Sequence, residues 1–200
     1  MSAAYPRPVL ADLLPRTAVR DVSLVVGAAL LTAVCAQIAI PLEPFSPVPI
    51  TAQTFAVLLT GAALGPLRGA LGQGLYVGMG MFLPFYSEGG SGLAHLVGPT
   101  GGYLIGFVVA GWLIGALARR GQDRRVHRAL LAFGLGHLVI FTFGVSWLAV
   151  VANLDLRGAL LAGLVPFIPG MILKTALAAG LLPAAWKLAG GDGAQPRSEG

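Results

Sequence analysis

The sequence predicts an all-α integral membrane protein, built as one bundle of six transmembrane helices. Hydrophobic residues make up 56% of the 200-residue chain, charged residues make up only 10%, and the mean hydropathy is +0.81. Soluble domains carry roughly a quarter charged residues, so this composition indicates a lipid environment. The apolar residues also form runs of about 17 to 25 residues, which is long enough to cross the ~30 Å hydrocarbon layer.

Six apolar runs define the predicted spans. They lie at 21–41, 51–65, 69–85, 101–118, 128–151 and 170–189. The second run is short, so it must stand nearly upright, cross a thinned region or begin among protein rather than lipid. The predicted organisation is a cytoplasmic N-terminal segment (1–20), a six-helix membrane domain (21–190) and a short cytoplasmic tail (191–200).

The basic residues predict the orientation of the bundle. Eleven of the thirteen Lys and Arg residues lie in the termini or in the loops after the second and fourth spans, and only Arg157 lies in an opposite loop. By the positive-inside tendency, both termini are cytoplasmic. The basic residues form no patch with interleaved aromatic residues, so the net charge of +5 reflects topology and not nucleic-acid binding. The thirteenth basic residue, Lys174, lies inside the last span.

Signals for processing and for metal binding are missing from the sequence. Residues 1–20 lack the apolar core and small-residue cleavage site of a signal peptide. Cys35 is the only cysteine, and no metal-ligand spacing surrounds it. We expect Cys35 to pack in the interior, and we expect no metal or cofactor.

Small residues recur at helical spacing. Glycine pairs four residues apart predict closely packed helices within the chain; they are Gly65 and Gly69, Gly74 and Gly78, Gly102 and Gly106, and Gly111 and Gly115. The first span carries two adjacent ridges of small residues, formed by Ala28, Thr32 and Ala36 and by Ala29 and Ala33. Such a flat face either docks a partner protein or packs inside the bundle.

Three outward-facing segments differ in character. The segment 41–55 has four prolines in nine residues, which favours an extended, semi-rigid path that forms a lid or a wall. The segment 84–104 combines glycines with aromatic and hydroxyl side chains, which is typical of a backbone that wraps closely around something. In the third, 152–170, Pro166 and Pro169 predict a break between an interfacial or re-entrant piece and a last helix that begins near Gly170.

Lys174 is the most informative residue of the last span. An unpaired ammonium in hydrocarbon costs about 3 kcal/mol or more, and the start of a helix disfavours a cation further. The Lys174 ammonium and the free amide groups at the start of the helix are both positive, so together they are suited to bind an anion, preferably a carboxylate. Two alternatives stay open: the amine snorkels to the membrane surface, or it pairs with Asp155 or Glu88.

Three stretches together resemble the signature blocks of the BioY family, the biotin-capturing S component of energy-coupling-factor (ECF) transporters. They are "PVPITAQTFAVLLTGAALGPLRGALGQGLYVGMG", "GPTGGYLIGF" and "PFIPGMILK", and the similarity covers roughly residues 20–190. The resemblance implies a six-helix S-component bundle in the bacterial cytoplasmic membrane that binds biotin from outside. It also implies partnership with an ECF transmembrane coupling subunit and two cytoplasmic ATPase subunits, or operation alone. The coupling subunit is expected to dock on the ridges of the first span.

The resemblance also implies site residues. Lys174 is expected to hold the biotin carboxylate, Tyr103 to pack or hydrogen-bond along the ring system, and Gln53 to contact the ureido group. The weaker candidates are Ser91, Gly98, Pro99 and Thr100. Alternatively, Gln53 forms a hydrogen bond between two helices. Thr100 alternatively caps the helix that begins at 101. Many family members carry an aspartate where this sequence has Met171, which puts the ligand's pose in doubt.

The sequence leaves functions other than biotin capture to consider. The chain has no P-loop pattern, so we expect a transport subunit and no ATPase activity. The "GGSG" at 89–92 raises the alternative of an intramembrane serine protease with Ser91 as nucleophile and His95 or His137 as base. A capture subunit for another carboxylated vitamin and a stand-alone pore or structural protein are the remaining alternatives, although the polar lining of the spans is thin for a pore.

Overall fold

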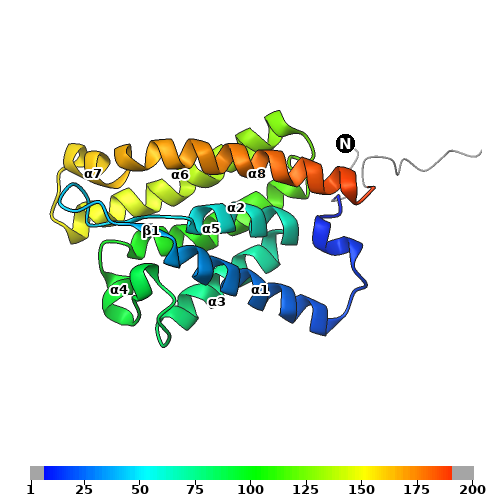
Figure 1. Ribbon diagram of the computed structural model, residues 1–200, viewed down its shortest axis with the longest axis horizontal. Helices are drawn as coiled ribbons and strands as arrows, with labels where there is room; N and C mark the ends of the chain where they lie inside the picture. The colour runs from blue at the N-terminus through cyan, green and yellow to red at the C-terminus, as the bar shows by residue number, and fades with distance from the viewer. Residues whose placement is uncertain (1–6, 191–200) are drawn as a thin grey trace, which may run out of the picture.

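The computed structural model describes residues 7–190 and shows a single bundle of helices (Figure 1). In chain order the elements are η1 (Leu10–Leu13), α1 (Ala18–Gln37), β1 (Ala39–Ile40), β2 (Ile50–Thr51), α2 (Gln53–Leu64), α3 (Pro66–Gly80), η2 (Ser87–Gly89), α4 (Leu93–Val97), α5 (Gly101–Ala118), α6 (Val126–Val151), α7 (Leu156–Gly163), η3 (Val165–Phe167) and α8 (Ile168–Leu188). The predicted tail 191–200 lies outside the described residues.

The two ends of the bundle differ. The hairpin β1–β2, α4 and α7 lie at one end, and the first described residues and the end of α8 lie at the other (Figure 1). We call these the loop end and the terminal end. Basic residues that the orientation rule placed in the cytoplasm, such as Arg68 and Arg119, belong to the terminal end, so the loop end is the outer one.

The six predicted spans correspond to α1, α2, α3, α5, α6 and α8. Four segments are long and apolar enough to cross a membrane, namely α1, α5, α6 and the run Leu156–Leu188 that includes α7 and α8. Helix α2 has 12 residues, about 18 Å at 1.5 Å per residue, which agrees with the short second span. Helix α3 ends at Gly80 and not near residue 85, because the chain turns there and the ring of Tyr86 packs on Gly80.

The predicted break before the last helix is confirmed. Helix α7 ends at Gly163, a 3₁₀ turn containing Pro166 follows, and α8 begins at Ile168 with Pro169 in its first turn. Proline is tolerated there because the first amides of a helix have no intrahelical acceptor. Asp155 caps α7, since its Oδ1 accepts the amide of Gly158 at 2.8 Å. The chain before α8 therefore forms a separate short helix, α7, and a turn, and α8 begins two residues before the predicted Gly170.

Three of the four glycine pairs pack as predicted. A Cβ on Gly115 would lie 2.3 Å from the carbonyl carbon of Gly65, and one on Gly102 would lie 2.3 Å from Cβ of Trp147. Gly65, with φ of 85°, alone joins α2 to α3 and allows the tight reversal between them. The prediction is wrong for Gly74 and Gly78, because nothing in the described chain lies within 4 Å of a Cβ at either position.

The small-residue ridges of α1 face the interior of the bundle. Ala28, Ala29, Thr32, Ala33 and Ala36 are each less than 5% exposed. A Cβ on Gly72 of α3 would lie 2.7 Å from Cβ of Ala28, which shows how closely the two helices approach. The expectation of an accessible docking face is therefore wrong for this conformation, since the ridges pack against α2 and α3. A docking role for these five residues stays a prediction that requires the helices to separate.

A buried polar cluster ties α1, α2 and α3 together. The side-chain amide nitrogen of Gln73 donates to the hydroxyl oxygens of Thr32 and Thr60, at 3.1 Å each. The two hydroxyls donate in turn to backbone carbonyls four residues earlier, at 2.9 Å and 2.7 Å. Because lipid offers no hydrogen-bond partners, these bonds favour one register of the three helices.

Several charged residues at the terminal end form ion pairs. Asp12 bonds Arg68 and Arg119, each at 3.0 Å, and Arg68 also lies 3.3 Å from Asp21. Desolvation opposes the charge of Asp12, but the hydrogen bond from Arg68 and the nearby guanidinium groups keep the pKa of this carboxyl below its usual value. These pairs hold the N-terminal segment against the ends of α3 and α5.

Candidate ligand-binding site

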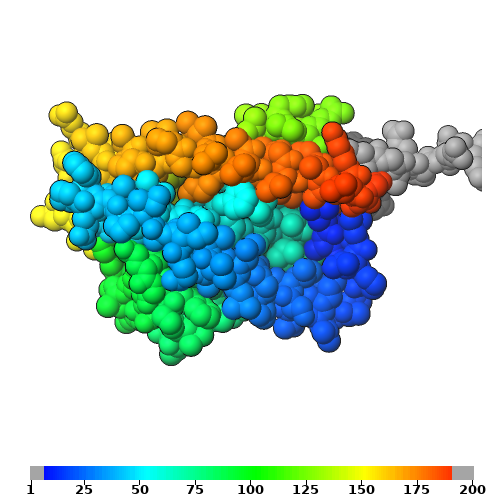
Figure 2. All heavy atoms as spheres, viewed as in Figure 1, coloured from blue at the N-terminus to red at the C-terminus, as the bar shows by residue number. Residues whose placement is uncertain are grey.

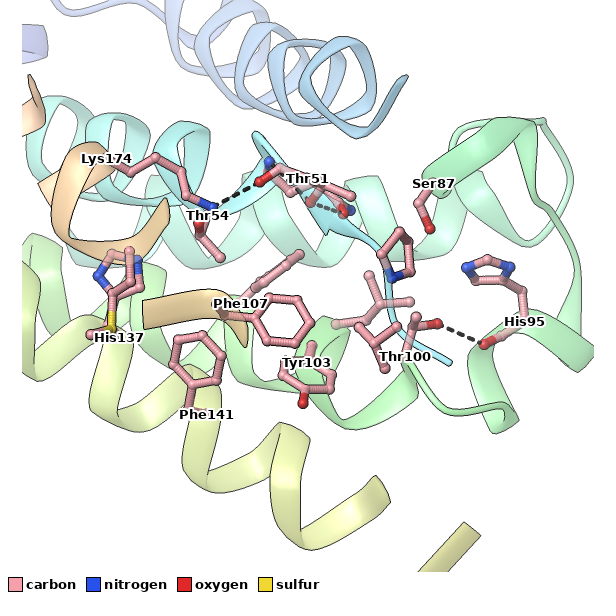
Figure 3. A pocket seen from close by; sticks show the side chains of 16 residues that line it. Thr51, Thr54, Ser87, His95, Thr100, Tyr103, Phe107, His137, Phe141 and Lys174 are labelled. Carbon is pink, nitrogen blue, oxygen red and sulfur yellow. Dashed lines mark hydrogen bonds between the residues drawn. The ribbon is translucent and has the colours of Figure 1, made fainter. Parts of the chain in front are cut away.

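A narrow cavity opens at the outer end between the hairpin, α2, α5, α6 and α8 (Figure 3). About 550 Å³ of space free of protein atoms lies within it and at its mouth, a figure that includes open solvent. Its lining is Val48, Pro49, Thr51, Gln53, Thr54, Ser87, His95, Thr100, Tyr103, Leu104, Phe107, His137, Phe141, Phe167, Met171 and Lys174. Among these described residues Lys174 is the one permanent charge, and none is acidic.

The hairpin forms one wall of the cavity, as the prolines of 41–55 predict. Its strands pair antiparallel, with Ala39 opposite Thr51. Val48 is buried, and the Ser46 hydroxyl fixes the turn by accepting the amide of Val48 at 3.0 Å. In the space-filling view the hairpin lies directly against α7 and the start of α8 (Figure 2). The cavity is therefore covered from this side.

The glycine-rich segment before α5 forms the opposite wall. Tyr86 is fully buried and donates its hydroxyl to the carbonyl of Val77 at 2.7 Å. His95 stacks on Tyr86 with ring centroids 4.8 Å apart. Burial lowers the pKa of His95, and the charge of Glu88 partly opposes that shift. The aromatic residues of this segment thus hold Ser87 and His95 at the cavity, which agrees with a backbone that wraps around a site.

Lys174 reaches into the cavity and not toward the membrane surface. Its Nζ donates to the carbonyl of Thr51 at 2.8 Å, just before α2 begins, and the side chain points into the space above His137 (Figure 3). No Asp or Glu in residues 7–190 lies within ion-pair distance of it, so the snorkelling and salt-bridge alternatives do not describe this lysine. An ammonium has three donors, and the bond to Thr51 uses one of them.

Tyr103 contributes its ring to the cavity and uses its hydroxyl elsewhere. The hydroxyl donates to the carbonyl of Gly163 at 2.7 Å and so ties α5 to the end of α7. The ring packs against α6 so closely that a Cβ on Gly144 would lie 2.3 Å from it. Phe141 meets the ring edge to face, with centroids 6.0 Å apart. Tyr103 is thus placed to pack along a ligand, and its hydroxyl is already bonded.

Gln53 and Thr100 line the cavity with their polar groups partly used. The Gln53 side chain donates to the Tyr76 hydroxyl at 2.6 Å and accepts from the Thr51 hydroxyl at 2.7 Å, so it joins α2 to α3 as the alternative interpretation proposed. Thr100 precedes α5 but does not cap it through its side chain, which instead donates to the carbonyl of His95 at 3.3 Å. The capping alternative for Thr100 is therefore wrong.

Three weaker candidates are not among the cavity-lining residues. Gly98 serves as an acceptor for the Trp147 indole N–H at 2.9 Å, and Pro99 follows it. Ser91 is exposed in the loop before α4. His95, the nearest base in sequence, stacks on Tyr86, and no hydrogen bond described for residues 7–190 joins it to Ser91. This geometry does not assemble the nucleophile and base of a serine protease.

Sequence reasoning missed several lining residues. Phe107, Phe141 and Phe167 supply apolar lining to the cavity, but phenylalanine in an apolar span looks like ordinary core. Ser87 lies in the segment 84–104 and Thr54 in the segment 41–55. Both segments were predicted to face outward, and this location was the only sequence signal for the two residues. His137, treated as a satisfied interior group, could have been noticed as the one ionisable residue of the fifth span that is not near an end.

Comparisons with known proteins agree with this arrangement. The profile of the BioY family matches residues 8–191. A probable biotin transporter BioY of Pyrococcus horikoshii is 38% identical over 160 residues, covering 80% of this chain and 91% of that protein. The biotin transporter BioY of Thermotoga maritima is 39% identical over 137 residues, covering 68% of this chain and 79% of that protein.

A solved structure has the same fold. It is the crystal structure, at 2.1 Å, of the S-component for biotin from an ECF-type ABC transporter. The two folds superpose with a TM-score of 0.78 and 26% sequence identity, over 86% of this chain and 95% of that chain. This similarity confirms the predicted all-α S-component-like bundle. Together, the profile match and the sequence and structural similarities show that this chain belongs to the BioY family.

Proposed function

We propose that this protein captures biotin at the outer face of the membrane and delivers it inward as the substrate-binding subunit of an ECF transporter. The observation that carries the proposal is the position of Lys174, an uncompensated ammonium within a cavity lined otherwise by aromatic and hydroxyl side chains. Such a cavity suits a small amphipathic anion, because the cation fixes one end of the ligand and the apolar walls enclose the rest.

The cavity is polar at both ends and apolar between them. Lys174, Thr54 and His137 lie at one end, and Ser87, His95 and Thr100 lie at the other (Figure 3). The rings of Tyr103 and Phe107 lie between these ends. Biotin has a matching order of groups: a carboxylate, an aliphatic chain, and a bicyclic ring with a ureido group. We expect the carboxylate at Lys174 and the ureido group near Ser87 and Thr100.

Gln53 keeps a secondary role in this proposal. Its amide is engaged by Tyr76 and Thr51, so its remaining N–H and lone pair are the groups left for a ligand. Met171 lines the cavity one turn from Lys174, where an acidic side chain would compete for the ammonium. Because methionine cannot pair with the ammonium, Lys174 can donate to the ligand instead.

Transport requires partners. We propose that a transmembrane coupling subunit and two cytoplasmic ATPase subunits supply the energy, in the bacterial cytoplasmic membrane. The similarity to an S-component of an ECF-type transporter supports this context. The relatives' names as biotin transporters support a role in binding and transport and not in catalysis.

Equilibrium binding by the purified protein in detergent tests the proposal. We expect biotin to bind reversibly and with far higher affinity than biotin methyl ester, because esterification removes the charge that Lys174 recognises. Pantothenate and nicotinate, two other carboxylated vitamins, should bind weakly, since neither has a bicyclic ring to fill the aromatic section. Tighter binding of either vitamin than of biotin would favour the alternative substrate class and refute the proposal.

A further inference from the structure

Two polar atoms that line the cavity are buried without a protein partner. They are the hydroxyl oxygen of Thr54 on α2 and Nε2 of His137 on α6. Both lie beside Lys174, which belongs to α8 (Figure 3). A buried polar atom that lacks a hydrogen bond costs about 1–3 kcal/mol, so two such atoms at one end of a cavity indicate a ligand that completes them.

His137 is held rigidly enough to act as a ligand contact. The residue is 1% exposed, and its ring lies parallel to that of Phe141, at an interplanar angle of 20° with centroids 6.2 Å apart. Its Nδ1 lies 3.1 Å from the hydroxyl oxygen of Thr175, the residue that follows Lys174. When this hydroxyl donates to Nδ1, the ring proton is on Nε2, and Nε2 is a donor at the cavity.

The three groups have the chemistry of a carboxylate receptor. Lys174 has donors beyond the one that Thr51 accepts and Thr54 has a free hydroxyl, and His137 offers one N–H in the tautomer in which Thr175 donates to Nδ1. A carboxylate has two oxygens and about four acceptor positions, so it can accept from all three at once. The cavity lining holds no acidic side chain that would compete for these donors.

We propose that His137 and Thr54 join Lys174 in holding the ligand carboxylate, with Thr175 as the positioning residue for the His137 ring. This inference rests on the proposed binding of biotin and assigns its carboxylate to one end of the cavity. Three helices then meet at the carboxylate, since Thr54 comes from α2, His137 from α6 and Lys174 from α8.

The test compares biotin with biotin methyl ester in four variants of the full chain. His137→Phe keeps an aromatic ring and removes the donor, so we expect it to weaken biotin binding roughly 10- to 100-fold and ester binding less than about threefold. His137→Gln, whose amide nitrogen reaches nearly the position of Nε2, should recover most of the loss. Thr54→Val, which is nearly isosteric, should lower the preference for the acid over the ester by roughly 5- to 20-fold.

Thr142 provides a control on α6, the helix that carries His137. Thr142 is exposed on α6 and donates its hydroxyl to the carbonyl of Leu138, so Thr142→Val should change neither affinity. Melting temperatures in detergent identify any variant that fails to fold, and Thr54→Val tests the same end of the cavity without altering α6.

The outcomes separate this inference from the proposed function. If wild-type protein binds biotin but His137→Phe and Thr54→Val leave the preference for acid over ester unchanged, the inference is overturned and the proposed function stands. Equal losses for acid and ester also overturn it, because they place these side chains elsewhere along the ligand. Failure of wild-type protein to bind biotin overturns both.

Discussion

Removing the charge of Lys174 should weaken biotin binding by a calculable amount. Lys174→Met keeps the length and apolar volume of the side chain and deletes the ammonium. The bond from Nζ to the Thr51 carbonyl is lost whether or not a ligand is bound, so its loss largely cancels from the binding free energy. What remains is the charge-assisted hydrogen bond to the ligand, worth about 1.5–3 kcal/mol. At about 1.4 kcal/mol per factor of ten, this corresponds to a roughly 10- to 150-fold higher Kd.

Isothermal titration calorimetry or retention of radiolabelled biotin in detergent measures this change. Lys187→Met is a matched control, because Lys187 also lies on α8 but is exposed at the terminal end, and we expect it to bind biotin as wild type does. Lys174→Glu should weaken binding more than Lys174→Met, since it sets one carboxylate against another. Biotin affinity within about twofold of wild type in Lys174→Met would refute the assignment of the carboxylate to Lys174.

Three further predictions concern packing and pH. Ala33→Trp should lower the melting temperature in detergent and the yield of folded protein, because Ala33 is 4% exposed and overpacking costs about 1–3 kcal/mol. Gly144→Ala should weaken biotin binding, because the new Cβ would lie 2.3 Å from the Tyr103 ring, which must then move within the cavity wall. His95, whose pKa burial lowers from 6.5, should make the protein less stable as the pH falls below about 6.5, since the unfolded chain takes up that proton first.

Each of these predictions has a control or a contradicting outcome. Val34→Trp, at a position 63% exposed on the same helix, should be tolerated, and equal melting temperatures for both tryptophan variants would contradict the buried position of the ridge. Gly134→Ala on α6 has nothing within 4 Å of its new Cβ and should leave affinity unchanged. His95→Phe keeps the stack on Tyr86 and should make the pH dependence smaller; a dependence of unchanged size would assign it to other groups.

The number and order of the helices were predictable because hydrophobicity along the chain reports directly on lipid burial. The predicted fourth span coincides with α5, and the break at Pro166 and Pro169 follows from the missing amide of proline. The end of α3 was not predictable, because the residues after Gly80 are as apolar as those before it. That end depends on a tertiary contact, the Tyr86 ring packed on Gly80.

The candidate site was predictable only in part. Lys174 was visible as a charge without a partner in an apolar run, and this is a property of the sequence itself. The small residues of α1 were ambiguous, since a flat ridge serves an internal neighbour as well as a partner protein, and only burial separates the two. His137 depends on Thr175, 38 positions later, so its orientation follows from the crossing of α6 and α8 and from no local pattern.

The contacts of Lys174 also help to fix the position of α8 against the rest of the bundle. Three side-chain hydrogen bonds described within residues 7–190 connect α8 to other parts of the chain: Lys174 to Thr51, Thr175 to His137, and Trp186 to Asp123. The first two involve the cavity-lining residues Lys174 and His137, so the residues proposed to hold the ligand also connect α8 to β2 and α6. If a ligand carboxylate binds Lys174 as proposed, it shares or replaces the bond to Thr51 of β2, so we expect ligand binding to loosen the link between α8 and the hairpin.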